Sequence, residues 1–324
     1  MQILRTLRSL ALVALGLGAC LTAHAEFPSR PITLIAPMAP GGGGDITARA
    51  IGEQMSKDLG QPVIVDNRPG ATGIIGLAHA AKQPADGHSI LISSTTFQIH
   101  NALLRKNLPF DPIRDFVPVS MIGEGVFAFV VPKDAPYQNM DDFLQASARK
   151  PEGLTVGSWG NLSAAHLMTE YLNKIAPGTL VHVPYQGEVP MFNDLIGGNL
   201  DGGWATQMTA ANMQQAGRVK ILGTTGTSRN KAMMDTPTFG EQGIDGLEMT
   251  GWIGVFAPAG TPRDAVDRLS ESVRKALTHP EVIKRMEAMG TEIVASTAEE
   301  FQRSFDRDYA NWARIVETSG IEKQ

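Results

Sequence analysis

Four consecutive glycines, Gly41 to Gly44, stand directly before Asp45 in the N-terminal part of the chain. The apolar segment 31–36 before them predicts a strand, and apolar residues at helical spacing from Ile46 to Met55 predict a helix after them. Glycines at such a turn leave backbone N–H groups unshielded, and the helix N-terminus adds unpaired N–H groups and partial positive charge. This arrangement binds an anion, carboxylate or phosphate, without a cationic side chain. The plainer alternative is a flexible loop in which Asp45 caps the helix.

The glycines fit neither of the common nucleotide-binding patterns. A P-loop requires a lysine followed by Ser or Thr directly after its last glycine, and no lysine follows here. The dinucleotide pattern Gly-x-Gly-x-x-Gly also fails, because its last position falls on Ile46 when counted from Gly41 and on Thr47 when counted from Gly42. An anion other than a nucleotide is therefore favoured.

The sequence contains no pattern typical of a catalytic or metal centre. Of the seven histidines, one lies in the first 25 residues, and the others lack the spacing of a metal-binding pair. A Gly-x-Ser-x-Gly nucleophile turn is absent from the sequence. The single cysteine, Cys20, lies near the N-terminus. We therefore predict no catalytic residues, no metal and no cofactor.

Four further turns supply hydrogen-bonding or aromatic side chains; three follow predicted strands, and the fourth, Trp204-Ala205-Thr206, ends a Gly-Asn-Leu-Asp-Gly-Gly segment. Ligands of open α/β sheets bind beyond the carboxyl ends of the strands, so these turns are expected to converge with the glycine turn. Each has a plainer explanation when taken alone, because Ser and Thr often cap helices and Trp is usually a core residue. The candidate ligand-binding residues of all five turns are Ala39, Pro40, Gly41, Gly42, Gly43, Gly44, Asp45, Thr95, Thr96, Ser158, Trp159, Gly160, Ser163, His166, Pro184, Tyr185, Gly187, Trp204 and Thr206.

Residues 1–25 have the pattern of an export signal. Arg5 and Arg8 give a positive start, an apolar segment follows, and Ala23-His24-Ala25 is a small-x-small cleavage site. Cleavage after Ala25 would leave 299 of the 324 residues and no cysteine. The segment Leu17-Gly18-Ala19-Cys20 resembles a lipoprotein cleavage site, and lipidation of Cys20 is the alternative. Either outcome predicts export to the periplasm.

The exported chain is acidic. Removing the two arginines of the signal from the 28 basic residues leaves 26 against 33 acidic ones, a net charge of −7 with His neutral. Nucleic acid is an unfavourable partner for such a chain. The length suggests two domains or one large one.

Short apolar runs alternate with amphipathic segments through the rest of the chain. Alternating strands and helices predict an α/β fold with mostly parallel sheets covered by helices. A capping box at Ser296 and Glu299 predicts where the last helix begins. The predicted strands lie at 63–65, 90–92, 127–131, 154–156, 181–183, 219–222 and 253–256, and the predicted helices at 45–58, 72–82, 139–149, 162–175, 188–197, 262–278 and 297–317.

Several stretches resemble the Bug-type extracytoplasmic solute receptors, the binding components of tripartite tricarboxylate transporters. They occur in the order of the family and cover nearly the whole chain after residue 25, so the resemblance is specific. The matching stretches are Phe27-Pro28-Ser29-Arg30-Pro31-Ile32, Pro40-Gly41-Gly42-Gly43-x-Asp45, Asp66-Asn67-Arg68-Pro69-Gly70-Ala71, Pro84-Ala85-Asp86-Gly87-His88, Pro109-Phe110-Asp111-Pro112, His182-Val183-Pro184-Tyr185-Gln186-Gly187, Leu195-Ile196-Gly197-Gly198 and Phe256-Ala257-Pro258-Ala259-Gly260-Thr261-Pro262.

The resemblance implies a two-lobed periplasmic binding protein of a type II-like fold. Each lobe would be a mostly parallel sheet flanked by helices, with the ligand in the cleft between the lobes. We expect lobe 1 to comprise 26–126 plus 254–324 and lobe 2 to comprise 127–253. The resemblance also implies that the glycine turn, the hydroxyl turn at 93–96, the stretch 157–166 and the turn 184–187 contact the ligand, partly through water. We further expect Trp159 and Trp204 to wall the cavity.

One position departs from the family. Many members carry an aspartate where this chain has Thr206. A carboxylate partner for a ligand ammonium group would then be missing, so we expect a ligand without an amino group.

We interpret the chain as a periplasmic receptor that captures a small organic carboxylate, either a di- or tricarboxylate or an aromatic acid. It would deliver this ligand to the membrane subunits of a transporter, as a monomer without a cofactor. One alternative is a ligand-sensing module for a signalling receptor, because capture and closure look alike in both uses. Another is an exported α/β enzyme acting on carboxylates, for which Asp45 and His166 are the candidate catalytic groups. No pattern identifies the acid itself.

Overall fold

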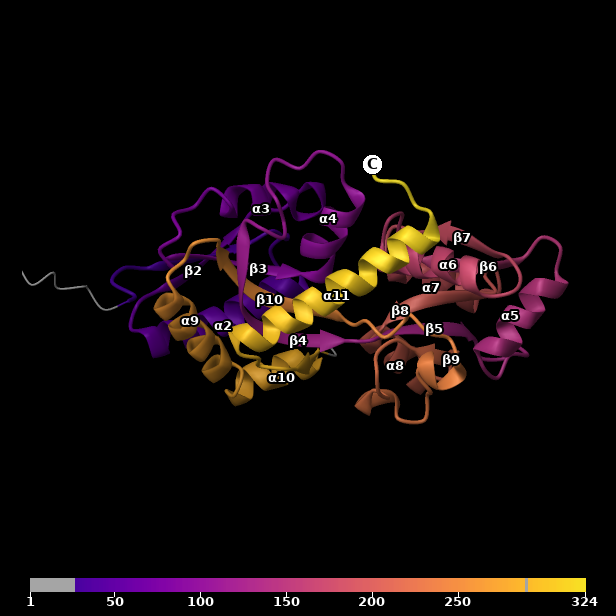
Figure 1. Ribbon diagram of the computed structural model, residues 1–324. Coiled ribbons are helices and arrows are strands. Elements are labelled where there is room, and N and C mark those ends of the chain that lie inside the picture. Colours follow the sequence, from indigo (N-terminus) through magenta and orange to yellow (C-terminus); the bar gives the residue numbers. More distant parts are fainter. Residues whose placement is uncertain (1–26, 289–290) are drawn as a thin grey trace, which may run out of the picture.

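The structure, a computed structural model, describes residues 27–288 and 291–324. It contains two β-sheets, each covered by helices, toward opposite ends of an elongated molecule (Figure 1). The expected export signal at 1–25, with both of its possible cleavage sites, lies outside the described residues. Within 27–288 and 291–324, every helix is too short or too polar to cross a membrane.

The six-stranded sheet forms the first lobe. Its strand order is β11-β4-β10-β3-β1-β2. β1 pairs in parallel with β2 and β3, whereas β10 pairs antiparallel with both β3 and β4. The strands are β1 Ile32–Ala36, β2 Val63–Asn67, β3 Ser89–Ser94, β4 Phe116–Gly125, β10 Gly251–Pro258 and β11 Glu292–Ile293.

The five-stranded sheet forms the second lobe and repeats the same pattern in the order β7-β6-β8-β5-β9. β6 pairs in parallel with β7 and β8, and β5 pairs antiparallel with β8 and β9. The predicted two-lobed α/β fold is therefore confirmed, with one strand reversed against the parallel set in the middle of each mixed sheet. The strands are β5 Phe127–Pro132, β6 Leu154–Ser158, β7 Leu180–Pro184, β8 Gly202–Thr206 and β9 Val219–Thr224.

In the described part of the chain, the backbone crosses between the two sheets twice. The first strand after each crossing, β5 or β10, is the one that runs antiparallel to its neighbours. β4 ends at Gly125 and β5 begins at Phe127 in the other sheet, while β10 brings the chain back from β9. β4 and β10 stay paired as far as Gly125 and Gly251, so a hydrogen-bonded ribbon makes the crossing. At its end the Val126 N–H donates to Oε1 of Gln207 at 3.2 Å.

Helices cover both sheets. In the first lobe α2, α9 and α10 form one layer, and α3 lies against β1 and β3. In the second lobe α6 and α7 both pack on β6, and α8 packs on β5 and β9. A π-helical turn at Thr96–His100 leads directly into α4. The helices are α2 Gly43–Leu59, α3 Ile74–Ala80, α4 Asn101–Leu104, α5 Met140–Arg149, α6 Ala164–Ile175, α7 Glu188–Ile196, α8 Gln207–Gln215, α9 Arg263–Ala276, α10 Pro280–Ala288 and α11 Ala298–Ser319.

The predicted strands and helices are present within a few residues of their expected limits. Six strands and helices were not predicted, namely β4, β8, β11, α4, α8 and α10. The capping box of α11 lies one residue later than expected. Thr297 Oγ1 accepts from the Glu300 N–H at 3.2 Å, and Glu300 Oε2 accepts from the Thr297 N–H at 2.8 Å. Ser296 cannot serve as the cap because its Oγ accepts from the Met121 N–H at 2.9 Å, which ties it to β4.

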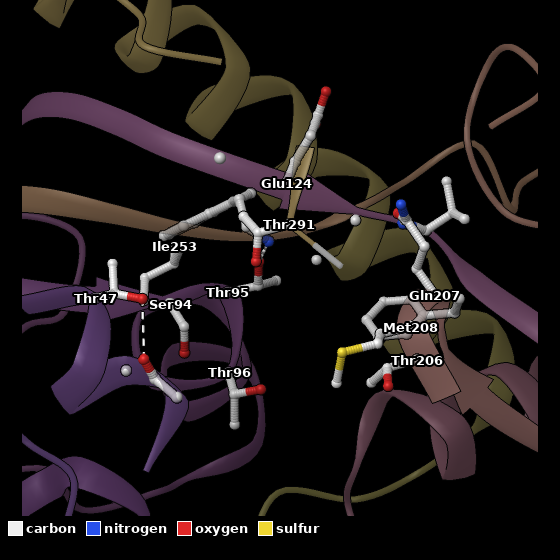
Figure 2. A pocket seen from close by; sticks show the side chains of 18 of the residues that line it. Thr47, Ser94, Thr95, Thr96, Glu124, Thr206, Gln207, Met208, Ile253 and Thr291 are labelled. Carbon is white, nitrogen blue, oxygen red and sulfur yellow. Dashed lines mark hydrogen bonds between the residues drawn. The ribbon is translucent and has the colours of Figure 1, made fainter. Parts of the chain in front are cut away.

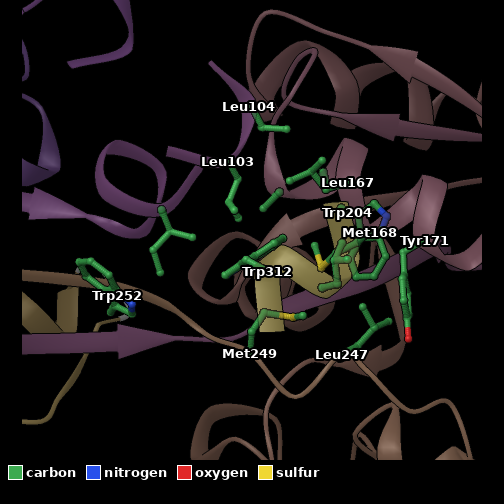
Figure 3. Packing of buried hydrophobic residues seen from close by; sticks show 14 of the residues in the cluster. Leu103, Leu104, Leu167, Met168, Tyr171, Trp204, Leu247, Met249, Trp252 and Trp312 are labelled. Atoms are coloured by element: carbon green, nitrogen blue, oxygen red, sulfur yellow. The ribbon is translucent and has the colours of Figure 1, made fainter. Parts of the chain in front are cut away.

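The last helix, α11, joins the two lobes. It contacts β4 of the first sheet and α6 of the second lobe. Its Trp312 is fully buried and packs in a hydrophobic cluster that contains residues of both lobes. Figure 3 shows Trp312 with Leu103 of the first lobe on one side and Leu167 of the second lobe on the other. The C-terminal segment, expected in lobe 1, therefore also packs on the second lobe.

Replacing Trp312 should destabilise the protein strongly. Because the indole is fully buried, Trp312→Ala leaves a cavity and should lower the free energy of unfolding by about 3–5 kcal/mol. Urea denaturation followed by circular dichroism measures the change. Arg303→Ala, on the exposed face of the same helix, is the control and should change the same quantity by less than about 0.5 kcal/mol. Similar losses in the two variants would contradict the packing role of Trp312.

Candidate functional site

A cleft of about 420 Å³ lies between the two lobes. One wall is the first turn of α2 together with the end of β3, and the opposite wall is the turn between β8 and α8 (Figure 2). The β4–β10 ribbon closes the third side. The lining residues are Gly43, Gly44, Thr47, Ser94, Thr95, Thr96, His100, Gly123, Glu124, Gly125, Val126, Phe127, Thr206, Gln207, Met208, Gly251, Trp252, Ile253 and Thr291.

The glycine turn leads into the first turn of α2. The helix begins at Gly43, with Gly42 as its N-cap residue. Gly43 and Gly44 line the cleft, and their backbone N–H groups have no hydrogen-bond partner among the described residues. The partial positive charge of the helix is located at the same place. Within the turn only Gly41 requires the left-handed region, with φ at 81°, whereas Gly42 has φ at −76°, which any residue can adopt.

Asp45 holds this turn in shape. Its Oδ2 accepts from the Gly41 N–H at 2.8 Å and from Arg49 Nε at 3.0 Å, and its Oδ1 accepts from Asn67 Nδ2 at 2.9 Å. Burial opposes the ionised carboxylate, but these hydrogen bonds outweigh it and hold the pKa of Asp45 below its usual value. Asp45 is 3% exposed and does not line the cleft. It positions the N–H groups, as does Asn67, which the sequence indicated only as part of a turn.

The end of β3 supplies hydroxyl groups. Thr95 is buried, and its Oγ1 accepts from the Trp252 N–H at 3.0 Å, which ties this turn to β10. Ser94 and Thr96 line the cleft, and neither hydroxyl has a hydrogen-bond partner within 27–288 and 291–324. These two hydroxyls are therefore free to donate to an anion beside the N-terminus of α2.

The turn between β6 and α6 uses its polar side chains internally. Ser158 is fully buried, and its Oγ lies 2.6 Å from Nε2 of His182. Ser163 caps α6, because its Oγ accepts from the His166 N–H at 3.3 Å and donates to the Gly160 carbonyl at 2.7 Å. None of these residues lines the cleft beside α2. The Ser158 hydroxyl, expected to bind a carboxylate, instead holds the turn together.

His166 and His182 stack on one another, with ring centroids 3.9 Å apart and planes 9° from parallel. Nδ1 of His166 accepts from the Leu162 N–H at 3.1 Å, which fixes the turn. Burial and the neighbouring His166 lower the pKa of His182 to about 4. Burial also lowers the pKa of His166, against the opposing effect of Glu170. The Ser158–His182 contact lacks the features of a catalytic pair, because Ser158 has no exposed surface and no described carboxylate contacts His182.

The other expected site residues lie away from the cleft. Trp204 is fully buried and donates its indole N–H to Thr169 Oγ1 at 3.0 Å, so it is a core residue and the expectation that it walls the cavity is wrong. Tyr185 donates to Asp194 at 2.7 Å, and burial together with this hydrogen bond raises its pKa to about 12. Trp159 and Ser163 line a smaller hollow beside the cleft. The remaining residues lie on exposed or half-buried turns and are Ala39, Pro40, Gly41, Gly42, Gly160, Pro184 and Gly187.

Thr206 lines the cleft and has a carboxylate beside it. Glu188, at the start of α7, accepts from the Thr206 N–H, from Thr206 Oγ1 at 3.1 Å and from Thr209 Oγ1 at 2.6 Å. The negative charge expected to be missing at this position is therefore supplied from a neighbouring helix. Because Glu188 reaches Thr206 only through the pairing of β6 with β7 and β8, no local sequence pattern could have indicated it.

Among the described residues that line the cleft, Glu124 alone is charged. It accepts from Thr250 Oγ1 at 2.7 Å, and its carboxylate is turned away from Thr95 and Thr96 (Figure 2). The described residues contain no group of three or more His, Cys, Asp or Glu placed to hold a metal ion. The cleft thus presents neutral hydrogen-bond donors along the α2 wall, which suits a small anion.

Comparison with known proteins gives one family. The sequence profile described as "Tripartite tricarboxylate transporter family receptor" matches residues 47–321. A protein of Pseudomonas sp. (strain P51), named "UPF0065 protein in tcbD-tcbE intergenic region", is 36% identical over 291 residues, which cover 90% of this chain and 86% of that protein.

Solved structures with the same two-lobed fold include three similar proteins. The periplasmic binding protein BugD is 30% identical with a TM-score of 0.71, over 92% of this chain and 100% of that one. R. palustris Rpa4515 with adipate is 30% identical with a TM-score of 0.74, over 92% and 100%. MatC (Rpa3494) from Rhodopseudomonas palustris with bound malate is 27% identical with a TM-score of 0.70, over 90% and 100%.

The neutral histidine stack should make the protein less stable in acid. The pKa of His182 is about 4 in the folded state against 6.5 for a free histidine. Between these values the unfolded state binds more protons, so this contribution to the free energy of unfolding falls as the pH is lowered through that window. His182→Gln keeps a hydrogen-bonding group for Ser158 but does not titrate. The loss of stability between about pH 7 and about pH 4.5, measured by urea unfolding, should therefore be smaller in the variant. Equal losses in both proteins would rule out the stack as the cause.

Proposed function

Because the chain belongs to the tripartite tricarboxylate transporter receptor family, we propose that it is a periplasmic receptor for a small organic carboxylate. It binds the ligand in the cleft between its lobes and delivers it to the membrane subunits of a transporter. The observation that carries this proposal is the α2 wall. There the N–H groups of Gly43 and Gly44 and the hydroxyls of Ser94 and Thr96 line the same cleft, and none of them has a hydrogen-bond partner among the described residues. The adipate in Rpa4515 and the malate in MatC, both small carboxylates, support it.

The ligand carboxylate is proposed to lie at the N-terminus of α2. Backbone N–H groups and hydroxyls donate to its oxygens there, and the helix adds favourable partial charge. Glu124 disfavours an anion near the β4–β10 ribbon, since like charges repel at short range in a desolvated cleft. The acid is therefore oriented with its carboxylate toward Thr96 and away from the ribbon.

The lobes are proposed to close on the ligand. We place lobe 1 at 26–126 plus 254–324 and lobe 2 at 127–253, with the β4–β10 ribbon as the hinge. Closure would bring the turns at 158–163 and 184–187 toward the glycine turn. Because the hydroxyl of Ser158 is already bound to His182, the second lobe would contribute mainly backbone N–H groups and the indole of Trp159. The protein acts as a monomer in this scheme.

Gly43→Pro tests the backbone donors directly. Proline is well tolerated at the first position of a helix, and the extended backbone of Gly42, with ψ at 166°, suits a residue that precedes proline. The substitution removes one N–H from the α2 wall while the helix can still form. Losing one charge-assisted hydrogen bond should weaken carboxylate binding roughly tenfold to a hundredfold. Isothermal titration calorimetry against a panel of mono-, di- and tricarboxylates measures the affinities.

Gly43→Ala is the matched control, because it adds a side chain and keeps the N–H. Its affinity should stay close to that of the wild type. If the two variants bind the preferred acid equally well, backbone donation at this position is wrong. If the wild type binds no acid of the panel, the carboxylate receptor assignment itself is wrong.

Ligand binding should both stabilise and compact the protein. A ligand at a hundredfold excess over its Kd adds about 2.7 kcal/mol to the free energy of unfolding. For a chain of this length that should raise Tm by about 5 °C. Differential scanning calorimetry measures the shift, and small-angle X-ray scattering should show a smaller radius of gyration if the lobes close. A rise in Tm without compaction would remove hinge closure from the scheme and leave binding in place.

A further inference from the structure

The N-termini of two helices lie on opposite walls of the cleft. α2 begins at one wall, and α8 begins at the other with Thr206 as its N-cap residue (Figure 2). Gln207 and Met208, the first residues of α8, line the cleft, and their N–H groups have no hydrogen-bond partner among the described residues. By its backbone alone, α8 would therefore attract an anion as α2 does. The two walls differ in the acidic side chain that lies beside each helix.

Glu188 is the acidic side chain beside α8. Its carboxylate accepts from the Thr206 N–H, from Thr206 Oγ1 at 3.1 Å and from Thr209 Oγ1 at 2.6 Å. All of these donors are neutral, so they satisfy the carboxylate oxygens without cancelling the charge. A full negative charge therefore remains at this wall, one hydrogen bond behind a residue that lines the cleft.

The acidic side chain beside α2 is in a different situation. Asp45 lies in the first turn of that helix, but Arg49 pairs with it at 3.0 Å and compensates its charge. The partial positive charge of α2 can therefore act on a ligand, whereas the full charge of Glu188 exceeds the partial charge of α8. Glu124, at the β4–β10 ribbon, adds a second negative charge to the lining of the cleft. The cleft thus attracts an anionic group at α2 and repels one at α8.

Holding the start of α8 does not by itself require a charged side chain. A glutamine in place of Glu188 could accept from the Thr206 N–H through its carbonyl oxygen and donate from its amide to a threonine hydroxyl, which also accepts hydrogen bonds. What the carboxylate adds is an electrostatic effect that extends beyond hydrogen-bond distance to a ligand in the cleft.

We propose that Glu188 selects ligands by charge. With the ligand carboxylate held at the N-terminus of α2, Glu188 excludes a second anionic group from the far end of the ligand, where α8 begins, and admits a neutral or cationic one. This inference rests on the proposed function and narrows its substrate class to acids with a single anionic group. Glu188 acts across Thr206 and does not touch the ligand.

The test compares acids of equal length that differ only in the charge of the far end. Hexanoate ends in a neutral methyl group, adipate in a carboxylate and ε-aminocaproate in an ammonium group, and the corresponding butanoate and pentanoate series cover shorter ligands. Calorimetry on the wild type should show adipate binding about tenfold more weakly than hexanoate. Glu188→Gln should remove this difference, leave hexanoate within about twofold and weaken ε-aminocaproate. Opposite changes for the two charged ends would not follow from a general loosening of the fold.

Two variants serve as controls. Glu188→Asp keeps the charge and should keep the wild-type order of the three acids. Glu152→Gln removes the same charge from an exposed turn before β6, at the end of that strand away from the cleft, and should change none of the affinities.

The selector is wrong, while carboxylate binding stands, in either of two cases. In the first, the wild type binds the dicarboxylate as tightly as the monocarboxylate at the length that binds best. In the second, Glu188→Gln changes the affinities of all three acids by the same factor. If the wild type binds none of these acids, and none of the wider panel, both the selector and the proposed function are wrong.

Discussion

The pairing of β4 with β10 is the constraint on which the rest of the molecule depends. The two strands remain hydrogen-bonded up to Gly125 and Gly251, where the chain passes into the second lobe. The chain enters each sheet after a crossing on one strand, β5 in the second sheet and β10 in the first, and that strand runs against the parallel set. As a consequence, the carboxyl ends of the parallel strands in both sheets face the crossing. The turns after β1, β3, β6 and β8 are brought to the same region, although they lie far apart in the sequence.

Hydrogen bonds within these turns decide which groups are left for a ligand. Both carboxylate oxygens of Asp45 already accept hydrogen bonds, from Gly41, Arg49 and Asn67. Ser158 is similarly bound to His182. These contacts fix the backbone before any ligand arrives, so less conformational entropy is lost on binding. Among the described residues of these turns that line the cleft, the groups without a partner include the backbone N–H groups at the start of α2 and the hydroxyls of Ser94 and Thr96. Asp45 and Ser158 therefore shape the turns and do not line the cleft.

The sequence predicts features that depend on neighbouring residues, and it misses features that depend on segments far apart in the chain. Apolar periodicity located the main strands and helices because it reflects burial of one face, which is a local property. β8 was missed because its residues, Gly202–Thr206, include two glycines and no alternation, and only its pairing with β5 and β6 makes it a strand. The glycine turn was found because its chemistry lies in consecutive residues. Trp204 was misplaced, and Glu188 and His100 were missed, since their surroundings are set by segments distant in sequence.

An acidic protein that binds an anion must overcome its own charge. The net charge of the chain is −5 with His neutral, from 28 basic and 33 acidic residues, but salt screens such repulsion beyond about 8 Å at physiological ionic strength. Binding is therefore governed by the few groups nearest the ligand. Neutral N–H donors suit reversible binding of an anion for two reasons. The helix backbone fixes their direction, and they hold an anion less strongly than a buried cation would. Neutral donors act only at hydrogen-bond distance. If the lobes close on the ligand as proposed, opening them would therefore weaken the site without any change in charge, which suits a receptor that must also release its ligand.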